Sequence, residues 1–410
     1  MLMLDLDSLA SSISFSYLSN ALLAERAIPL VLTPPSLMQL RPENLFALQL
    51  ASTPLPTLLH LSSLPSGPSS LAQHGAKFAL VDHNKLLPIF ENGKVVAILD
   101  HHQDDGEHLD ANPRTIQVPT GSCAALVAKH FAPEWQAAIS GPAGQAGSPV
   151  PPEVATLLLS SILIDTGGLK TKEGSKTTQT DLEAASFLWP LSTLGNTTEA
   201  NFASEVPLPL KDLTQELLDT KSDVSRLSTH DLLIRDYKSY SLATSSVAFP
   251  VLKVGLSTVP MGLKTWLGRD GSGWDGLLDD TDAYMAEHDL DIEGILTTYR
   301  SDKGNHKREL VLILSSGAKR AITNDEQAER IFNELVAGLE ADPVLDLGEW
   351  KKKSLLKSLD KTKKGEVMVA GDTFVKDGRW GKVWSQRNTS ATRKQLQPVL
   401  VSLVCHLNSD

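Results

Sequence analysis

The sequence predicts an α/β protein with two domains, and three observations support this fold class. Short, nearly continuous apolar runs at 78–81 and 95–99 have the length and composition of buried parallel strands. Longer segments with the apolar spacing of helices alternate with these runs. A length of 410 residues exceeds what one hydrophobic core usually organises, and a hydrophobic content of 41% is enough to build two cores.

The first domain is expected over residues 1–210, with a mainly parallel sheet flanked by helices. Its first strand ends at Leu4, and Ser8 or Asp7 can cap a helix from Leu9 to about Glu25. The elements expected next are strands at 28–32, 78–81 and 95–99, helices at 123–130, 154–164 and 181–189, and surface loops at 133–152 and 170–180.

The second domain is expected over residues 228–410, after a linker near 205–228 that follows a segment rich in Asn, Thr and Pro. The elements expected in it are strands at 239–246, 253–259, 295–299 and 310–314, and an amphipathic helix at 325–339. This pattern favours a mixed sheet with flanking helices.

Four polar clusters each follow an apolar run: Asp5-Leu6-Asp7, Asp82-His83-Asn84, Asp100-His101-His102 and Asp165-Thr166-Gly167. Open α/β sheets carry their chemistry at the carboxyl ends of their strands. Hard divalent cations prefer carboxylate oxygens, whereas imidazole also suits Mn²⁺, Co²⁺ or Zn²⁺. One such Asp alone would more often be a turn or cap residue. The four clusters together predict one divided metal site, in which two ions could hold a hydroxide and neutralise a phosphate.

The strings LDLDSLAS, VDHN, ILDHH and LIDTGGL, in this order, resemble motifs I to IV of the DHH phosphoesterases. The string Thr392-Arg393-Lys394-Gln395 is similar to the Ser-Arg-Lys signature of one branch, which contains yeast-type exopolyphosphatases, family-II inorganic pyrophosphatases and prune-like proteins. The resemblance implies a DHH domain followed by a DHH-associated, substrate-binding domain. It also implies two divalent metal ions, Mn²⁺ or else Mg²⁺ or Co²⁺.

The resemblance assigns the metal ligands position by position. Asp82 would bridge the two ions, of which Asp5 binds one and Asp7 the other. His101 and Asp165 would complete the shell of the ion at Asp7.

The resemblance also implies which residues act beside the metals. His102 would face the substrate and bind phosphate or protonate the leaving oxygen, and it forms the expected catalytic pair with Asp82. His83 and Asn84 would position the bridging Asp82 without binding a metal themselves, as polar partners of metal ligands commonly do. Asp100 is likewise expected to support the ligands without binding a metal.

Arg393 and Lys394 are the phosphate-binding residues expected from the second domain, where domain closure could bring them to the substrate. Arg308 is a third candidate, because it precedes a predicted strand. Residues 351–394 contain thirteen basic and four acidic residues, although the chain as a whole has a formal charge of −11. Such a local field suits a phosphate chain, but a solvated helix face at 351–364 would show the same pattern.

We therefore expect an exopolyphosphatase that releases orthophosphate from the end of linear polyphosphate by attack of a metal-activated hydroxide. Three alternatives stay open: a pyrophosphatase, a nucleotide phosphodiesterase, and a catalytically impaired prune-like interaction protein. The expected partner is polyphosphate or another small phosphoanhydride. Nucleic acid is not expected, because few aromatic residues interleave the basic ones at 351–393. The oligomeric state is left open.

A cytoplasmic location is expected. Cys123 and Cys405 are too few for a disulfide framework, and no run of about 18 apolar residues predicts a membrane span. The related enzymes have Asn or His four residues before the first motif-I Asp, where this chain has Met1. The first strand is therefore expected to be truncated, with a weakened metal site.

Overall fold

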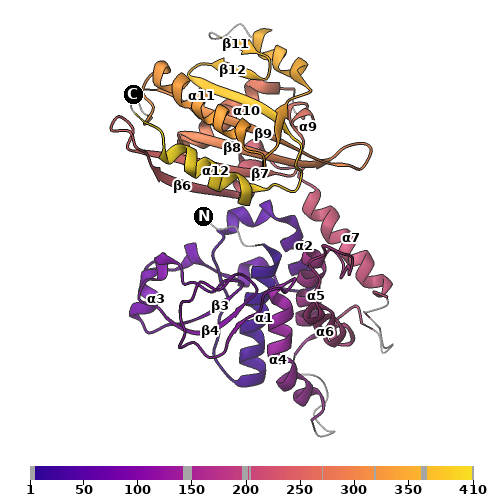
Figure 1. The fold of residues 1–410 in the computed structure, drawn as a ribbon. Helices are drawn as coiled ribbons and strands as arrows, with labels where there is room; N and C mark the ends of the chain where they lie inside the picture. Colours follow the sequence, from indigo (N-terminus) through magenta and orange to yellow (C-terminus); the bar gives the residue numbers. More distant parts are fainter. Residues whose placement is uncertain are drawn as a thin grey trace. The chain divides into compact units, whose positions relative to one another are not determined.

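The computed structural model describes residues 5–141, 150–195, 202, 205–269, 271–317, 320–361 and 367–408. The chain divides into two compact units, and the division falls between Asp223 and Val224. Figure 1 shows helices and strands in both units, so both belong to the expected α/β class. The strand expected at 1–4 lies outside the described residues.

The first unit contains two small parallel sheets. Its three-stranded sheet has the order β3 (Lys77–Val81), β4 (Lys94–Asp100) and β5 (Arg114–Ile116), and its two-stranded sheet pairs β1 (Leu30–Val31) with β2 (Leu59–His60). Both sheets are parallel, which confirms the predicted sheet type. Ile98 and Leu99 of β4 are fully buried, as expected for a strand covered on both faces.

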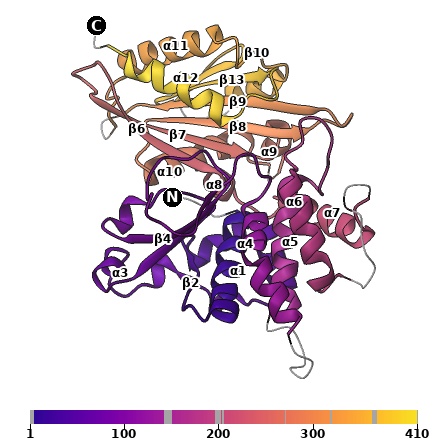
Figure 2. The ribbon, with the colours of Figure 1, turned by 60° about the horizontal axis from the view of Figure 1, so that its bottom comes forward.

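Helices make up most of the first unit. They are α1 (Leu6–Leu23), α2 (Pro42–Leu50), α3 (Ser69–Gln73), α4 (Cys123–Ile139), α5 (Pro152–Thr166), α6 (Gln179–Leu188) and α7 (Leu208–Ser222), with short 3-10 helices at Pro35–Leu40, Leu55–Thr57, Leu61–Ser63, Pro88–Phe90 and Trp189–Leu191. Figure 2 shows α1, α4 and α5 side by side, and all three contact one another. Leu18 and Leu158 lie in the core that they share.

Two predicted details of the first unit are wrong. Asp5, rather than Ser8 or Asp7, caps α1, because its Oδ1 accepts the Ser8 N–H at 3.1 Å. The loop predicted from 133 is still helix α4 up to Ile139, because the buried side chains around Pro133 hold the helix together. The division between the units falls within the range expected for the linker, and most of that range is α7, which packs against α2 and α5.

The second unit is built on an eight-stranded mixed sheet with the order β11-β12-β13-β9-β8-β7-β6 and with β10 beside β13. The strands are β6 (Tyr237–Ala243), β7 (Val251–Val259), β8 (Ile292–Arg300), β9 (His306–Ser315), β10 (Leu347–Glu349), β11 (Val367–Ala370), β12 (Thr373–Lys376) and β13 (Arg379–Gln386). β7 and β8 are parallel, and the other pairs are antiparallel. The predicted mixed sheet is confirmed.

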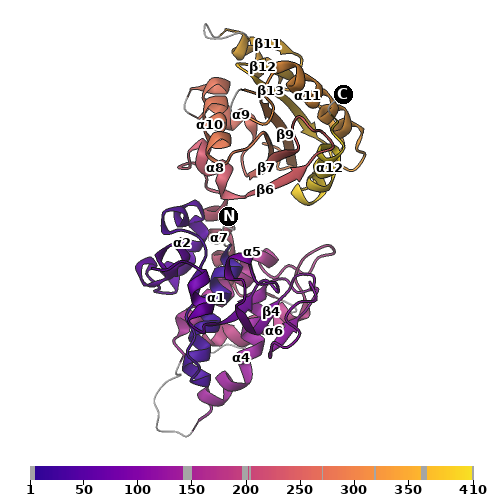
Figure 3. The same cartoon turned by 90° about the vertical axis from the view of Figure 1, so that its left-hand side faces the viewer.

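Helices cover both faces of this sheet, as Figure 3 shows. On one face lie α11 (Asp325–Ala341) and α12 (Arg393–Cys405), and on the other lie α8 (Thr229–Arg235), α9 (Leu263–Leu267) and α10 (Gly273–Glu287), while a 3-10 helix spans Lys353–Lys361. Leu256 and Leu310 belong to the apolar core under α11 and α12. Within the described ranges, no helix combines the length and apolar character needed to cross a membrane.

Candidate metal centre

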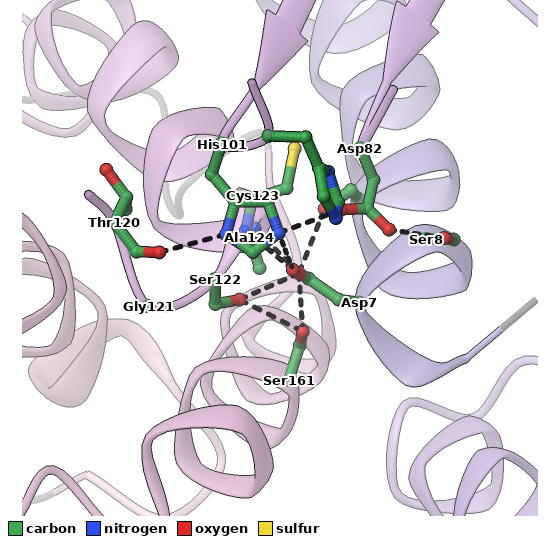
Figure 4. A network of polar contacts seen from close by, with 12 residues as sticks. Asp7, Ser8, Asp82, His101, Thr120, Gly121, Ser122, Cys123, Ala124 and Ser161 are labelled. Atoms are coloured by element: carbon green, nitrogen blue, oxygen red, sulfur yellow. Dashed lines mark hydrogen bonds and ion pairs between the residues drawn. The ribbon is translucent and has the colours of Figure 1, made fainter. Parts of the chain in front are cut away.

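Asp7 lies in the first turn of α1, and its carboxylate is buried at the N-terminus of α4 (Figure 4). Its hydrogen-bond donors are the N–H groups of Cys123 at 2.6 Å and Ala124 at 2.9 Å and the hydroxyl groups of Ser122 at 2.7 Å and Ser161 at 2.8 Å. Three of these bonds end on Oδ1. The partial positive charge of a helix N-terminus stabilises an anion, so the start of α4 is a favourable place for a buried carboxyl group.

His101 lies between the carbonyl of Thr120 and two carboxylates, as Figure 4 shows. Its Nδ1 is 3.0 Å from Thr120 O, an atom that can only accept, so Nδ1 carries the proton. Its Nε2 is 3.1 Å from Asp82 Oδ1 and 3.7 Å from Asp7 Oδ2. In the neutral ring, the Nε2 lone pair and both carboxylate oxygens are therefore available to one cation.

Excess negative charge surrounds His101. Burial lowers the pKa of His101, but the hydrogen bond to Asp82 and the charges of Asp7 and Asp82 outweigh it and raise the pKa to about 9. Without a metal, the proton on Nε2 thus occupies the place between the carboxylates where a cation would bind. Burial, together with the nearby carboxylates of Asp7 and Asp5, raises the pKa of Asp82 to about 6.

Asp82 follows β3 and adopts a left-handed backbone with φ of 64°. Non-glycine residues adopt this conformation rarely, and Asp does so more readily than most. The Ser8 hydroxyl donates to Asp82 Oδ2, which leaves Oδ1 directed at His101. The turn therefore aims one carboxylate oxygen into the same space as His101 Nε2.

His102 is held by Asp100 rather than by the carboxylates around His101. Asp100 is fully buried at the end of β4, and its Oδ1 accepts from the backbone N–H groups of His101 and His102 and from His102 Nδ1 at 2.9 Å. The His102 side chain is 58% exposed. Its hydrogen bond to Asp100 raises the pKa of His102, and burial only partly offsets this effect. His102 can thus carry a proton near neutral pH.

Asn84 supports Asp100 instead of the expected Asp82. Its buried amide Nδ2 donates to Asp100 Oδ2 at 2.5 Å and to Gln103 O at 3.0 Å, and its Oδ1 accepts the Asp105 N–H at 2.9 Å. Asn84 thereby fixes the loop that carries the two histidines. The ring of His83 bonds to the carbonyl of Val81 at 2.9 Å, so its hydrogen bond goes to backbone.

Asp5 and Asp165 influence the site through their charges. Asp5 is exposed at the start of α1, and Asp165 lies in the last turn of α5. Burial raises the pKa of Asp165, and the carboxylates of Asp7 and Asp5 raise it further. Three carboxylates thus repel one another, which a divalent cation would relieve.

The residues present fit divalent cations. Asp82, His101 and His102 offer ligand atoms that all lie within 4.8 Å of one another, and Asp7 Oδ2 adds another oxygen. Carboxylate oxygens with imidazole nitrogen suit Mn²⁺, Co²⁺ or Mg²⁺. The raised pKa values of His101 and Asp82 point to the same need for positive charge.

Sequence reasoning missed the residues that position Asp7. Asp181 is fully buried and accepts the N–H groups of Gly121 at 2.9 Å and Ser122 at 3.2 Å, so it fixes the segment that opens α4. A side chain at Gly121 would place its Cβ 2.7 Å from Asp181 Oδ2, so this approach requires glycine. The Thr178-x-x-Asp181 capping box was the local signal for Asp181.

The phosphate-binding candidates of the second unit lie near the start of α12. Arg308 Nε donates to Thr389 O at 2.9 Å, in the loop before this helix. Arg393 donates to the carbonyl and carboxylate of Asp236 at 2.8 and 2.7 Å. Lys394 is exposed. Two of the three basic side chains are therefore already bonded within their own unit.

Ion pairs weaken the positive field expected at 351–394. Among the residues that the structure describes, seven basic side chains of this stretch pair with carboxylates of the second unit: Lys352, Lys353, Lys376, Arg379, Lys382, Arg387 and Arg393. Their partners include Asp275, Asp279 and Glu340, which are distant in sequence. The local excess of Lys and Arg thus overstates the charge available to a ligand.

Comparisons with known proteins identify relatives of this chain. Residues 215–403 match the family model described as DHHA2 domain. The protein named "Putative exopolyphosphatase" of Schizosaccharomyces pombe is 31% identical, over 98% of this chain and 88% of that protein. Exopolyphosphatase PRUNE1 of Bos taurus is 28% identical, over 77% of this chain and 62% of that protein. The manganese-dependent inorganic pyrophosphatase of Methanocaldococcus jannaschii is 25% identical, over 61% of this chain and 68% of that protein.

The fold and the site define a two-unit α/β protein with a carboxylate–histidine centre at the end of a parallel sheet. The chain belongs to the DHH phosphoesterases with a DHHA2 domain, in the branch of yeast-type exopolyphosphatases, family-II pyrophosphatases and prune proteins. The resemblance seen in the sequence is confirmed.

Proposed function

We propose that this protein is a metal-dependent exopolyphosphatase that releases orthophosphate from the end of linear inorganic polyphosphate. One observation carries the proposal: Asp7 Oδ2, Asp82 Oδ1 and His101 Nε2 converge on one buried, electron-rich space. The name of the relative in Schizosaccharomyces pombe supports polyphosphate as the substrate.

The proposed cofactors are two divalent ions, Mn²⁺ or else Mg²⁺ or Co²⁺. The residues proposed to hold them are Asp5, Asp7, Asp82, His101 and Asp165. The name of the manganese-dependent relative supports manganese. When bound, such ions lower the pKa of water and offset the charge of phosphate. The chain's own part is to bring these side chains together and to hold His101 through its Nδ1–H, which donates to Thr120 O, so that Nε2 faces the carboxylates.

His102 is the proposed proton donor to the departing phosphate. Asp100 holds its Nδ1, so Nε2 is the ring atom free to reach a substrate oxygen. The hydrogen bond to Asp100 raises the pKa of His102, which favours the charged imidazole. A cationic ring can donate a hydrogen bond to phosphate and then a proton.

Lys394, Arg308 and Arg393 are proposed to bind phosphate groups. Lys394 is exposed and can offer its ammonium group directly. The Arg308 and Arg393 guanidinium groups are anchored through some of their N–H groups, and five donors per guanidinium leave others for a ligand. We also propose a cytoplasmic location, supported by the free thiols of Cys123 and Cys405.

The test is orthophosphate release by the purified chain with Mn²⁺ or Mg²⁺. The substrates are long polyphosphate, tripolyphosphate, pyrophosphate and a nucleotide phosphodiester. Asp82→Asn removes the negative charge of the convergent carboxylate, and Asp110→Asn changes an exposed carboxylate as the matched control. We expect the wild type and Asp110→Asn to release orthophosphate from polyphosphate, and we expect Asp82→Asn to lose this activity.

Other outcomes select among the alternatives. Release from pyrophosphate alone would move the chain to the pyrophosphatase class, which the Methanocaldococcus jannaschii relative favours. Release only from the phosphodiester would identify a nucleotide phosphodiesterase. No orthophosphate release from any substrate, with Mn²⁺ binding intact, would favour the prune-like interaction protein.

A further inference from the structure

A second group of metal-ligating side chains lies in the C-terminal unit, on the sheet face that carries α8 and α10. His230 is in the first turn of α8, Glu287 ends α10 and His288 follows it directly. Their ligand atoms all lie within 4.8 Å of one another. None of these residues belongs to the centre around Asp82.

The geometry is close to that of a three-ligand site. His230 Nε2 is 3.0 Å from Glu287 Oε2. Ligand atoms bound to one tetrahedral ion at about 2.1 Å lie about 3.4 Å apart. Small side-chain rotations would therefore bring the three atoms into a common coordination sphere. The His230 and Glu287 side chains are 39% and 59% exposed, so a cation can reach them from solvent.

One buried polar atom of this group, His288 Nε2, has no hydrogen-bond partner among the residues that the structure describes. The Tyr284 side chain is fully buried, and its ring centre lies 4.5 Å from that of His288 and 5.5 Å from that of His230. A buried polar atom without a partner is unfavourable, so it calls for a ligand or a water.

A plain surface ion pair accounts for only part of this arrangement. It explains the contact between His230 and Glu287, which contributes little stability at such exposure. It leaves the shielded Nε2 of His288 without a function. A cation held by all three side chains would use this nitrogen and would neutralise the carboxylate.

The donor atoms select the class of cation. Two imidazoles and one carboxylate form the His₂Glu set that binds zinc, with a fourth position open to water. Nitrogen-rich sites bind Zn²⁺ more tightly than Mn²⁺, and Mg²⁺ prefers oxygen. The centre around Asp82 is rich in carboxylates and suits the harder ions. The two groups therefore differ in the metal that they should retain.

We propose that His230, Glu287 and His288 bind a Zn²⁺-class ion, which joins α8 to the end of α10. This site is separate from the proposed hydrolytic centre and does not depend on hydrolysis. Because α8 and α10 pack on each other, a bound ion would stabilise the C-terminal unit.

The test is metal binding by the full-length chain after chelation. Zn²⁺ is added in excess Mg²⁺, and bound zinc per chain is measured after gel filtration. We expect the double variant His230→Gln/His288→Gln to bind one zinc ion fewer than the wild type. His306→Gln changes an exposed histidine of the same unit and should retain the wild-type number.

Glu287→Gln provides a milder variant, because it removes only an exposed carboxylate charge. We expect it to weaken Zn²⁺ binding at least tenfold without unfolding the chain. Zn²⁺ should also raise the thermal midpoint of the wild type and of Asp82→Asn, but not that of the double variant. Equal zinc numbers in the wild type and the double variant, or an unchanged affinity in Glu287→Gln, would overturn the proposal.

Discussion

Asp100→Asn should lower the pKa of His102 and slow turnover. Asp100 is fully buried, and its Oδ1 accepts from two backbone N–H groups and from His102 Nδ1. An asparagine retains one oxygen that can still accept these bonds. It removes the negative charge, which is part of what raises the pKa of His102. Its amide group also meets Asn84 Nδ2, so a donor faces a donor.

The magnitude follows from the exposure of His102. A hydrogen bond to a charged group contributes about 1.5–3 kcal/mol. Because the His102 side chain is 58% exposed, water screens the interaction, and we expect the lower end, about 1.5 kcal/mol. This corresponds to about one pKa unit and roughly a tenfold loss of turnover. The pKa of His102 is raised in the wild type, so the charged form would now be lost at a lower pH.

Two measurements check this expectation. Proton NMR titration of the metal-free chain should show the His102 pKa falling by about one unit in Asp100→Asn. With Mn²⁺ bound, the alkaline limb of the kcat profile should move to lower pH by a similar amount. Asp110→Asn is the control for loss of a carboxylate, and circular dichroism confirms folding.

A double variant separates positioning from general damage. If Asp100 acts through His102, Asp100→Asn/His102→Asn should be no slower than His102→Asn alone. Losses that multiply, or a His102 pKa that does not move, would refute the reasoning.

Three further predictions concern protons and buried hydrogen bonds. Mn²⁺ affinity, measured by calorimetry, should rise between pH 6 and 9. His101 and Asp82 have metal-free pKa values of about 9 and about 6, and both must lose protons to bind the ion. An affinity that does not change with pH would contradict this prediction. Burial raises the pKa of Glu293 to about 8, so wild-type stability falls as pH rises from 4.5 to 8. In urea denaturation, Glu293→Gln should therefore exceed the wild type by on the order of 3 kcal/mol at pH 8.5 and match it near pH 4.5. Ser161→Ala removes a buried 2.8 Å donor to Asp7 and should destabilise the chain by about 1.5–3 kcal/mol in the same assay, and an unchanged midpoint would count against it.

The strands were predictable where burial on both faces produced a short apolar run. The run at 95–99 corresponds to β4, which extends by one residue at each end. Helix boundaries were less predictable, because Asp5, Asp7 and Ser8 are all good caps within four residues. Only the three-dimensional position of the Ser8 N–H selects Asp5. Pro133 likewise predicted a break that the buried neighbours Phe131 and Trp135 override.

The motifs placed Asp7, Asp82, His101 and His102 together, because strand ends and helix starts at one edge of a sheet are local features of the sequence. The partners that hold them could not be found in this way. Ser161 contacts Asp7 across 154 positions, so no local pattern connects the two residues. The same reason explains why the positive field at 351–394 was overestimated from the sequence. Acidic partners of its basic residues lie far away along the chain.

The shifted pKa values at the metal centre reflect burial together with more negative charge than the chain itself neutralises. Helix α4 and two serine hydroxyls satisfy Asp7 Oδ1, but Oδ2 still faces His101. Burial and the neighbouring carboxylates raise the pKa values of Asp82 and Asp165, and the carboxylates of Asp82 and Asp7 raise that of His101, so the metal-free centre favours bound protons. Cations that bind there must displace these protons, which couples metal affinity to pH. A centre that only stabilised the fold would gain from pairing its carboxylates with Lys or Arg, as the second unit does at Glu309 and Lys352. Asp7 and Asp82 instead contact His101 and neutral donors among the described residues, which favours a site shaped for metal ions.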